Sequence, residues 1–466
     1  MPLTRSRTRR GAALLGCGAL LLGLCAADSP LGLGGAYFPL DSSTLAVGPA
    51  GTVTRVFRPS ELVPGTRVLA AAPDSPALAR NQRDWLAAGR VPTVPELAGS
   101  SMVRDALLDL HVLSEPYGVA VAGHAPAWRY VWPRDAALVA TALARTGHHE
   151  DADRILDFLA RVQPAAGPFE ARYHADGSGV PDDRGPQTDS LGWVLWALGE
   201  VSEALPVEER REFVRSHRGL LDTSVRASLA LLDRPGSLPP PSADYWETTD
   251  DRLTLSTAAL LHAGLVAAGP LYEVLGAGAG AAEATAARDR LATAIHQAFG
   301  ADGYPRTLGG SAADVDLGVS FLLPPFAEPR PAVAQAWRAS TERLIRPAGG
   351  LAPGGSWRRD GVSWTTATSS NALTAAALGD RASAVQRLRW LDAHRTSAGS
   401  LPEKVLADGS PASVAPLAWA AAAVVIAVTE LEGPAALEGQ RFAPGGLPGA
   451  APGRAEQPRI EGTSGG

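Results

Sequence analysis

Two glutamates lie in loops ahead of expected helices, beside residues that can fix a carboxyl in place. Glu247 directly follows Tyr245 and Trp246. An indole beside a carboxyl excludes water, which favours the protonated form that can donate a proton. Glu403 follows Pro402, whose ring stiffens the backbone. One carboxyl that donates a proton and one that accepts a proton make a general acid–base pair, which is the chemistry of hydrolysis.

Each glutamate also has a purely structural interpretation. Glu247 could cap the helix expected from residue 254, together with Asp250 and Asp251, since helix N-termini favour carboxylates. Glu403 could be a solvated side chain paired with Lys404. Taken singly, neither loop decides between catalysis and a structural role.

Two further polar clusters open expected helices. Arg134 and Asp135 follow Trp132 closely, and a guanidinium beside a carboxylate offers a donor and an acceptor for neighbouring sugar hydroxyls. Asp135 could equally be a helix cap. The second cluster contains Arg184, Gln187 and Asp189. The chain has 11 Trp, and flat aromatic faces beside polar groups suit a pyranose, which has an apolar CH face and a rim of hydroxyls. These clusters favour a sugar site.

The elements that must position these residues are helices. Apolar residues recur at three- and four-residue spacing from about residue 74 onward. We expect helices over about 75–89, 98–114, 134–146, 149–162, 189–204, 207–232, 254–275, 281–298, 316–322, 331–345, 367–379, 381–395 and 416–432. Several form pairs joined at a glycine, and the loops between pairs hold the aromatic and acidic residues. An all-α closed ring of paired helices would gather those loops at one end.

The two ends of the chain differ from this helical region. Residues 1–27 join four arginines to an uncharged apolar run, which is typical of an export signal or a short N-terminal anchor. Both cysteines, Cys17 and Cys25, fall inside it, and lipidation at Cys17 is the less favoured alternative. Residues 28–73 form a lead-in of short strands and turns, 74–433 form the main domain, and 434–466 form a Pro- and Gly-rich disordered tail. We therefore expect a protein that is secreted or held on the outer face of the cell envelope.

Charge and composition restrict the partners. The formal net charge is -6, so the chain lacks the surplus of Lys and Arg that binding nucleic acid needs. No apolar stretch beyond the N-terminal segment is expected to span a bilayer, which leaves a possible N-terminal anchor as the expected membrane contact. His148, His149 and His174 lack carboxylates at metal-ligand spacing, so we expect no metal site. A monomer acting on an oligo- or polysaccharide fits these limits.

Taken together, the segments resemble the glucoamylase-like glycosidases, glycoside hydrolase family 15, in order from about residue 119 to 429. The run ending Trp132-Pro-Arg-Asp135 resembles the family's Trp-Thr-Arg-Asp. Trp246-Glu247 is similar to the Trp-Glu that supplies the general acid, and Ser400-Leu-Pro-Glu-Lys404 to the general-base loop. The remaining similar stretches are 187–192, 316–324 and 416–419.

The resemblance implies an (α/α)6 barrel that hydrolyses a terminal α-glucosidic bond by single displacement, without a cofactor. Glu247 is then the general acid and Glu403 the general base, with room between them for a water, which inverts the anomeric centre. The expected substrate contacts are Trp132, Arg134, Asp135, Arg184, Gln187, Asp189, Trp246, Asp316, Trp364 and Trp419. Pro133 and Thr248 depart from the family pattern, and the linkage stays open between the α-1,4, α-1,6 and α,α-1,1 types.

Two other classes compete with this interpretation. Terpene cyclases and prenyltransferases also use rings of paired helices, and Asp250-Asp251 or Asp314 with Asp316 could protonate a substrate or bind magnesium diphosphate. That class leaves the Arg-Asp and Trp-Glu pairs unexplained. The third class is a non-catalytic carbohydrate-binding envelope protein on the same fold, which would bind a malto-oligosaccharide without releasing glucose.

Overall fold

The computed structural model describes residues 42–248 and 250–433, so the expected signal segment and tail lie outside the described residues. The helices are α1 Ser75–Ala88, α2 Met102–Ser114, α3 Pro133–Arg145, α4 His149–Val162, α5 Asp189–Ala204, α6 Val207–Ser216, α7 Arg218–Leu232, α8 Leu255–Leu275, α9 Gly278–Phe299, α10 Pro331–Leu344, α11 Thr365–Ala377, α12 Arg381–Ala393 and α13 Ala418–Glu432. The strands are β1 Thr44–Val47, β2 Val53–Val56, β3 Ser363–Trp364, β4 Lys404–Val405 and β5 Pro411–Ala412. A 3-10 helix, η6, spans Leu317–Leu322.

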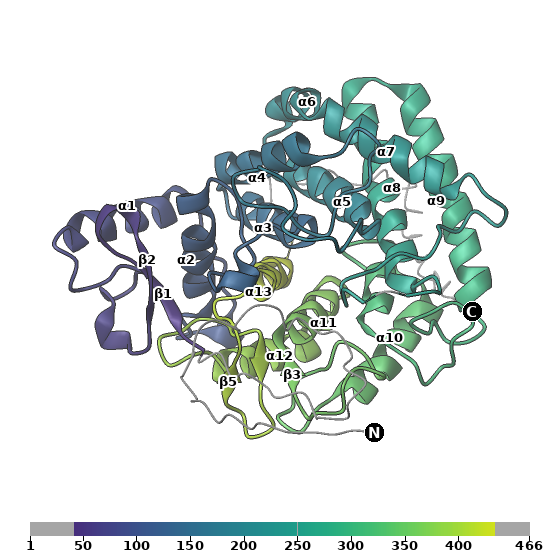
Figure 1. The fold of residues 1–466 in the computed structure, drawn as a ribbon. Coiled ribbons are helices and arrows are strands. Elements are labelled where there is room, and N and C mark those ends of the chain that lie inside the picture. The colour runs from purple at the N-terminus through teal and green to yellow at the C-terminus, as the bar shows by residue number, and fades with distance from the viewer. Residues whose placement is uncertain (1–41, 249, 434–466) are drawn as a thin grey trace, which may run out of the picture. The chain divides into compact units, whose positions relative to one another are not determined.

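The inner elements close into a ring, in which α3, α5, α8, α11 and α13 are labelled in Figure 1. In turn, α3 contacts α5, α5 contacts α8, α8 contacts η6, η6 contacts α11, α11 contacts α13, and α13 returns to α3. The outer partners of these six elements are α4, α7, α9, α10, α12 and α2. The predicted all-α (α/α)6 barrel is therefore confirmed.

Two predicted helices differ from the structure. The single helix expected over 207–232 is wrong, since the chain turns at His217, whose φ and ψ are -92° and 11°. The turn puts the His217 ring against Phe213, at 4.7 Å between ring centroids. The fourth inner element is not an α-helix but the short 3-10 helix η6. It cannot continue beyond Leu323, because Pro324 and Pro325 cannot donate helical hydrogen bonds.

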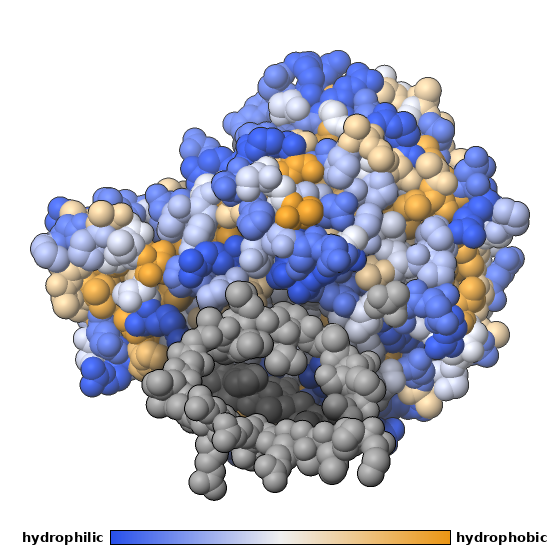
Figure 2. All heavy atoms as spheres, viewed as in Figure 1, coloured by the Kyte–Doolittle hydropathy of each residue, from blue (hydrophilic) through white to orange (hydrophobic). Residues whose placement is uncertain are grey.

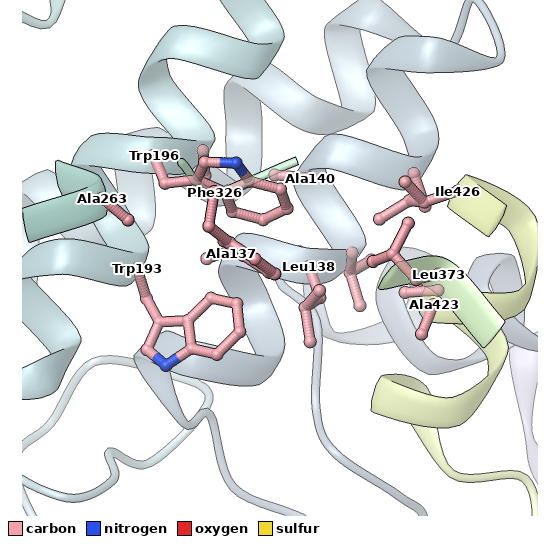
Figure 3. Close-up of a cluster of buried hydrophobic side chains, with 14 of the residues drawn as sticks. Ala137, Leu138, Ala140, Trp193, Trp196, Ala263, Phe326, Leu373, Ala423 and Ile426 are labelled. Atoms are coloured by element: carbon pink, nitrogen blue, oxygen red, sulfur yellow. The ribbon is translucent and has the colours of Figure 1, made fainter. Parts of the chain in front are cut away.

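The inner helices meet around a core of buried aliphatic and aromatic side chains (Figure 3). Trp193 of α5 packs edge-on against Phe326, with their ring centroids 5.4 Å apart. On the same helix, a β-carbon at Gly192 would lie 1.9 Å from the carbonyl oxygen of Leu260 in α8. Only glycine lets these two backbones approach so closely, so Gly192 helps to set the spacing of the ring.

One inner helix qualifies as a membrane span by length and composition alone, which corrects the expectation that no stretch beyond the N-terminus does. That helix is α8, and 61% of its most apolar stretch is buried inside the protein. It packs between α5 and α9. On the face in view, Figure 2 shows a largely hydrophilic surface with small, scattered hydrophobic groups. The apolar character of α8 therefore belongs to the core.

Two small sheets complete the fold. Strands β1 and β2 pair antiparallel within the lead-in, with Thr44 opposite Val56, and β1 contacts α2. Strands β3, β4 and β5 form an antiparallel sheet in which β4 is central. In that sheet Trp364 lies opposite Lys404, and Lys404 lies opposite Ala412. The second sheet therefore holds the backbone that follows Glu403 between strands β3 and β5.

Candidate active site

Glu247 lies between two arginines from different inner segments. Arg134, in the first turn of α3, donates from Nη2 to Glu247 Oε1 at 3.3 Å. Arg184 contacts the other carboxylate oxygen through Nη1. Glu247 itself has a φ of +55°, which is uncommon for a residue other than glycine, and its amide donates to the Asp244 carbonyl at 2.8 Å. A tight, strained turn thus aims this carboxylate at the two guanidinium groups.

The surroundings of Glu247 differ from the expectation that the adjacent indole desolvates it. Trp246 stacks instead on the guanidinium of Arg306, whose Cζ lies 3.6 Å from the ring centroid. Its other neighbour is Trp357, at 4.7 Å between ring centroids. The turn at Glu247 sends the two side chains to different neighbours: Glu247 contacts Arg134 and Arg184, whereas Trp246 packs on Arg306 and Trp357.

Glu403 is buried and held by one of its oxygens. Glu403 Oε2 accepts a hydrogen bond from Ser413 Oγ at 2.5 Å and lies 3.1 Å from Lys404 Nζ. The amide of Glu403 donates to the Val414 carbonyl at 2.8 Å, which brings the two sides of the loop together. Ser413 has a φ of +69°. A serine in a strained conformation therefore fixes the orientation of this carboxylate.

Arg134 and Trp419 connect the two glutamates. The Arg134 guanidinium that contacts Glu247 lies 5.0 Å from the ring centroid of Trp419, near the start of α13. Just before that helix, Leu417 donates its amide to the Leu401 carbonyl, two residues from Glu403. Glu247 and Glu403, 156 residues apart in sequence, are thus joined by a short chain of contacts at one end of the ring.

Two buried aspartates accompany Arg134. Burial raises the pKa of Asp135 to about 6, although the neighbouring Arg134 guanidinium opposes the shift. Asp189, at the start of α5, is fully buried, and burial raises its pKa to about 7 against the same opposing charge. Neither carboxylate oxygen of Asp189 has a hydrogen-bond partner of normal geometry. The site therefore holds an acidic group that gains its charge only near neutral pH.

Asp189→Asn should stabilise the protein more at high pH than at low pH. Between pH 3.8 and about 7 the unfolded chain releases this proton while the folded chain keeps it, so stability falls as pH rises through that window. Above pH 7 the burial of a charge penalises the folded state fully. Thermal unfolding of both proteins at pH 5 and pH 8 should show the difference in Tm, variant minus parent, increasing with pH. A difference that is constant across this range would contradict the protonated state.

Asp316, the N-cap of η6, accepts a hydrogen bond from Tyr245 in the loop that carries Glu247. Its Oδ1 accepts from the Gly318 amide at 2.8 Å. Its Oδ2 accepts from Arg306 Nη1 at 2.8 Å and from the Tyr245 hydroxyl at 3.0 Å. Only 2% of Asp316 is exposed, so the protein itself occupies this carboxylate. The predicted sugar contact at Asp316 stays a prediction, and the structure shows that both carboxylate oxygens accept hydrogen bonds from the protein.

Gln187, Trp132 and Trp364 are further predicted sugar contacts. Gln187 Oε1 accepts from Arg134 Nη1 at 3.5 Å. Trp132 is buried, with the Arg172 guanidinium 5.0 Å from its ring centroid. The ammonium of Lys404 lies 4.4 Å from the ring centroid of Trp364. Gln187 and Trp364 therefore contact direct partners of Glu247 and Glu403. Trp132 is linked to Glu247 through Arg172, Asp182 and Arg184.

Three functional candidates were not predicted from the sequence. They are Arg306, Trp357 and Ser413. Trp357 lies in an aromatic-rich loop, which was a usable signal, and it bridges Trp246 and Trp364 edge to face. Arg306 and Ser413 carry no local pattern, since their partners lie 10 to 62 residues away along the chain.

A ring of paired helices that brings two carboxyl groups, an Arg-Asp pair and indoles to one end is the architecture of a glycoside hydrolase. Residues 97–366, more than half of the chain, match the family described as Glycosyl hydrolases family 15. The chain belongs to this family, which sets aside the terpene cyclase alternative.

Two proteins illustrate the similarity in sequence. An isomaltose glucohydrolase from Kribbella flavida is 26% identical over 389 residues, which cover 71% of this chain and 97% of that protein. An uncharacterized glycosyl hydrolase from Methanocaldococcus jannaschii is 33% identical over 100 residues, or 21% of this chain and 16% of that protein. The first of these similarities extends over almost the whole relative.

Solved structures share the fold. A wild-type glycosidase has a TM-score of 0.61 at 24% identity, covering 72% of this chain and 96% of that chain. A bacterial glucoamylase complexed with acarbose has a TM-score of 0.58 at 17% identity, covering 71% and 55%. A glucoamylase from Saccharomycopsis fibuligera has a TM-score of 0.56 at 12% identity, covering 78% and 96%.

Proposed function

We propose that this glycoside hydrolase removes glucose from the non-reducing ends of α-glucosides with inversion, using Glu247 as general acid and Glu403 as general base. The observation that carries the proposal is the chain of contacts from Glu247 through Arg134 and Trp419 to the Glu403 loop. It brings two carboxyl groups with different surroundings to the same end of the ring. Different surroundings are what two carboxyl groups with opposite proton roles require.

The proposed reaction is a single displacement. Glu247 protonates the glycosidic oxygen as the bond from that oxygen to the anomeric carbon breaks. A water attacks the opposite face of this carbon and gives its proton to Glu403. The products are glucose of inverted configuration and the shortened saccharide, and solvent restores both protonation states. Carboxyl groups roughly 6.5 to 9.5 Å apart leave space for that water.

Arg134 and Asp135 are proposed to hold the terminal glucose. Both are buried at the N-terminus of α3, and Arg134 already contacts Glu247. A bound sugar would offer hydroxyls to the arginine in place of the Glu247 carboxylate. The Arg134 contact with Glu247 would then be exchanged for a contact with the sugar. Arg184, on the other oxygen, is proposed to act in the same way.

Among the possible linkages, we propose the α-1,6 bond of isomaltose-type substrates. The support is the similarity to an isomaltose glucohydrolase over 97% of its length. The test is kcat/KM on isomaltose, maltose and trehalose, with the protein purified from residue 28 onward. We expect isomaltose to give the largest value. A tenfold preference for maltose or trehalose would contradict the linkage, and binding without hydrolysis of any of them would support the non-catalytic alternative.

We also propose that the protein is exported and monomeric. The support for export is the arginine-rich and apolar segment over residues 1–27. Comparison of the mass of the mature protein with that of the full chain tests cleavage after Ala27. Retention of the segment on a membrane fraction would instead support an N-terminal anchor.

A further inference from the structure

Arg306 is a buried arginine that contacts three aspartates at once. Its Nη1 donates to Asp244 Oδ2 at 2.9 Å and to Asp316 Oδ2 at 2.8 Å. Its Nη2 donates to Asp244 Oδ1 at 3.1 Å and to Asp250 Oδ2 at 2.8 Å. Only 3% of the residue is exposed. Four hydrogen bonds from one guanidinium fix this side chain as a rigid centre.

Two of the three aspartates bracket the turn that carries Glu247, and the third lies at η6. Asp244 precedes Glu247 by three residues and Asp250 follows it by three, so Arg306 joins the two ends of the turn. Asp316 caps η6, so the same guanidinium also ties the turn to the inner ring. The flat face of Arg306 supports the Trp246 ring at 3.6 Å. The guanidinium thus contacts three residues that lie within three positions of Glu247, and one aspartate that anchors this stretch to η6.

The turn needs such support because its backbone is strained. Glu247 has a φ of +55°, and a residue other than glycine persists there only where its surroundings enforce the conformation. The guanidinium does not touch Glu247 itself. We propose that Arg306 is a positioning residue for the proton donor, acting through Asp244, Asp250 and Trp246. This inference rests on the proposed role of Glu247 as general acid.

The test compares two substrates that differ in their need for a proton. Cleavage of isomaltose requires protonation of the leaving oxygen, whereas α-glucosyl fluoride loses fluoride without a proton donor. In Arg306→Lys, which keeps the charge but loses the planar fork, kcat on isomaltose should fall by about 10- to 100-fold. On α-glucosyl fluoride it should stay within about threefold of the parent, because Glu403 and the attacking water are untouched.

Asp250→Asn provides a milder second variant that removes one anchor at the partly exposed end of the turn. It should show the same selective loss, smaller in size, and it keeps the test decisive if Arg306→Lys does not fold. The matched control is Arg145→Lys. Arg145 likewise binds two carboxylates, Glu200 and Glu430, with 10% of its side chain exposed, but it lies at the C-terminal end of α3, the end opposite Arg134. It should lower the Tm without changing the ratio of the two activities.

The outcomes separate this inference from the proposed function. Equal losses on both substrates in a folded Arg306→Lys or Asp250→Asn protein, or no loss on either, would overturn the positioning role. Glu247→Gln serves as the reference, since it should lose isomaltose cleavage and keep α-glucosyl fluoride cleavage. If Glu247→Gln loses both activities alike, the role of Glu247 fails, whatever the Arg306 variants show.

Discussion

Glu403→Gln should lower kcat on an α-glucoside by about 100-fold or more while leaving the fold intact. The amide is nearly isosteric with the carboxylate, but it cannot accept the proton of the attacking water. Both substrates need that water, so isomaltose and α-glucosyl fluoride cleavage should fall together. Steady-state kinetics on the two substrates, with thermal unfolding to check the fold, measure this effect.

The control for this variant is Glu212→Gln. Glu212 lies in α6 with most of its side chain exposed, so the same chemical change there should leave kcat unaltered. If Glu403→Gln retains near-parental activity on both substrates, another group must activate the water. The contacts of Ser413 and Lys404 with Glu403 would then have only a structural meaning.

Glu247→Gln should lower kcat on isomaltose by about 100-fold or more, with little loss on α-glucosyl fluoride. The glutamine keeps a side chain of similar size beside Arg134 and Arg184 but has no proton to give to the leaving oxygen. Fluoride departs without that proton, so only the poorer leaving group reveals the loss. The ratio of the two kcat values, variant against parent, is the quantity to measure.

A different pattern would assign the residue another role. A loss of the same size on both substrates would place Glu247 in binding or in the local fold and not in proton donation. Retained cleavage of isomaltose would remove it from the mechanism altogether. Because Glu403→Gln and Glu247→Gln have opposite expectations for α-glucosyl fluoride, each variant serves as a control for the other.

Helix positions were predictable because they depend on local periodicity. The ranges 149–162 and 189–204 agree with α4 and α5 residue for residue. The ring itself was inferred from paired helices with rich loops between them. The break at His217 was missed because the apolar spacing continues across it. The structure adds a contact distant in sequence, since His217 Nε2 lies 3.4 Å from a carboxylate oxygen of Asp157 in α4.

The proposed site was predictable only in part. Residue type and spacing singled out Glu247, Glu403 and Arg134, and all three lie at the same end of the ring. The partners that set their chemistry were not predictable, since Arg306 reaches Asp244 across 62 residues and Arg134 reaches Glu247 across 113. Such pairs are brought together by the closure of the ring, which leaves no periodic trace in the sequence. The partners of Asp316 were not predictable for the same reason, since Arg306 and Tyr245 lie 10 and 71 residues from it along the chain.

The most direct test of two opposed carboxyl groups is the configuration of the first glucose released. Proton NMR during the early turnover of isomaltose distinguishes the two anomers before they equilibrate. A water placed between Glu403 and the anomeric carbon attacks the face opposite the leaving group, so we predict that β-glucose forms first. Initial formation of α-glucose would mean retention, and it would contradict the assignment of Glu247 and Glu403 as acid and base of a single displacement.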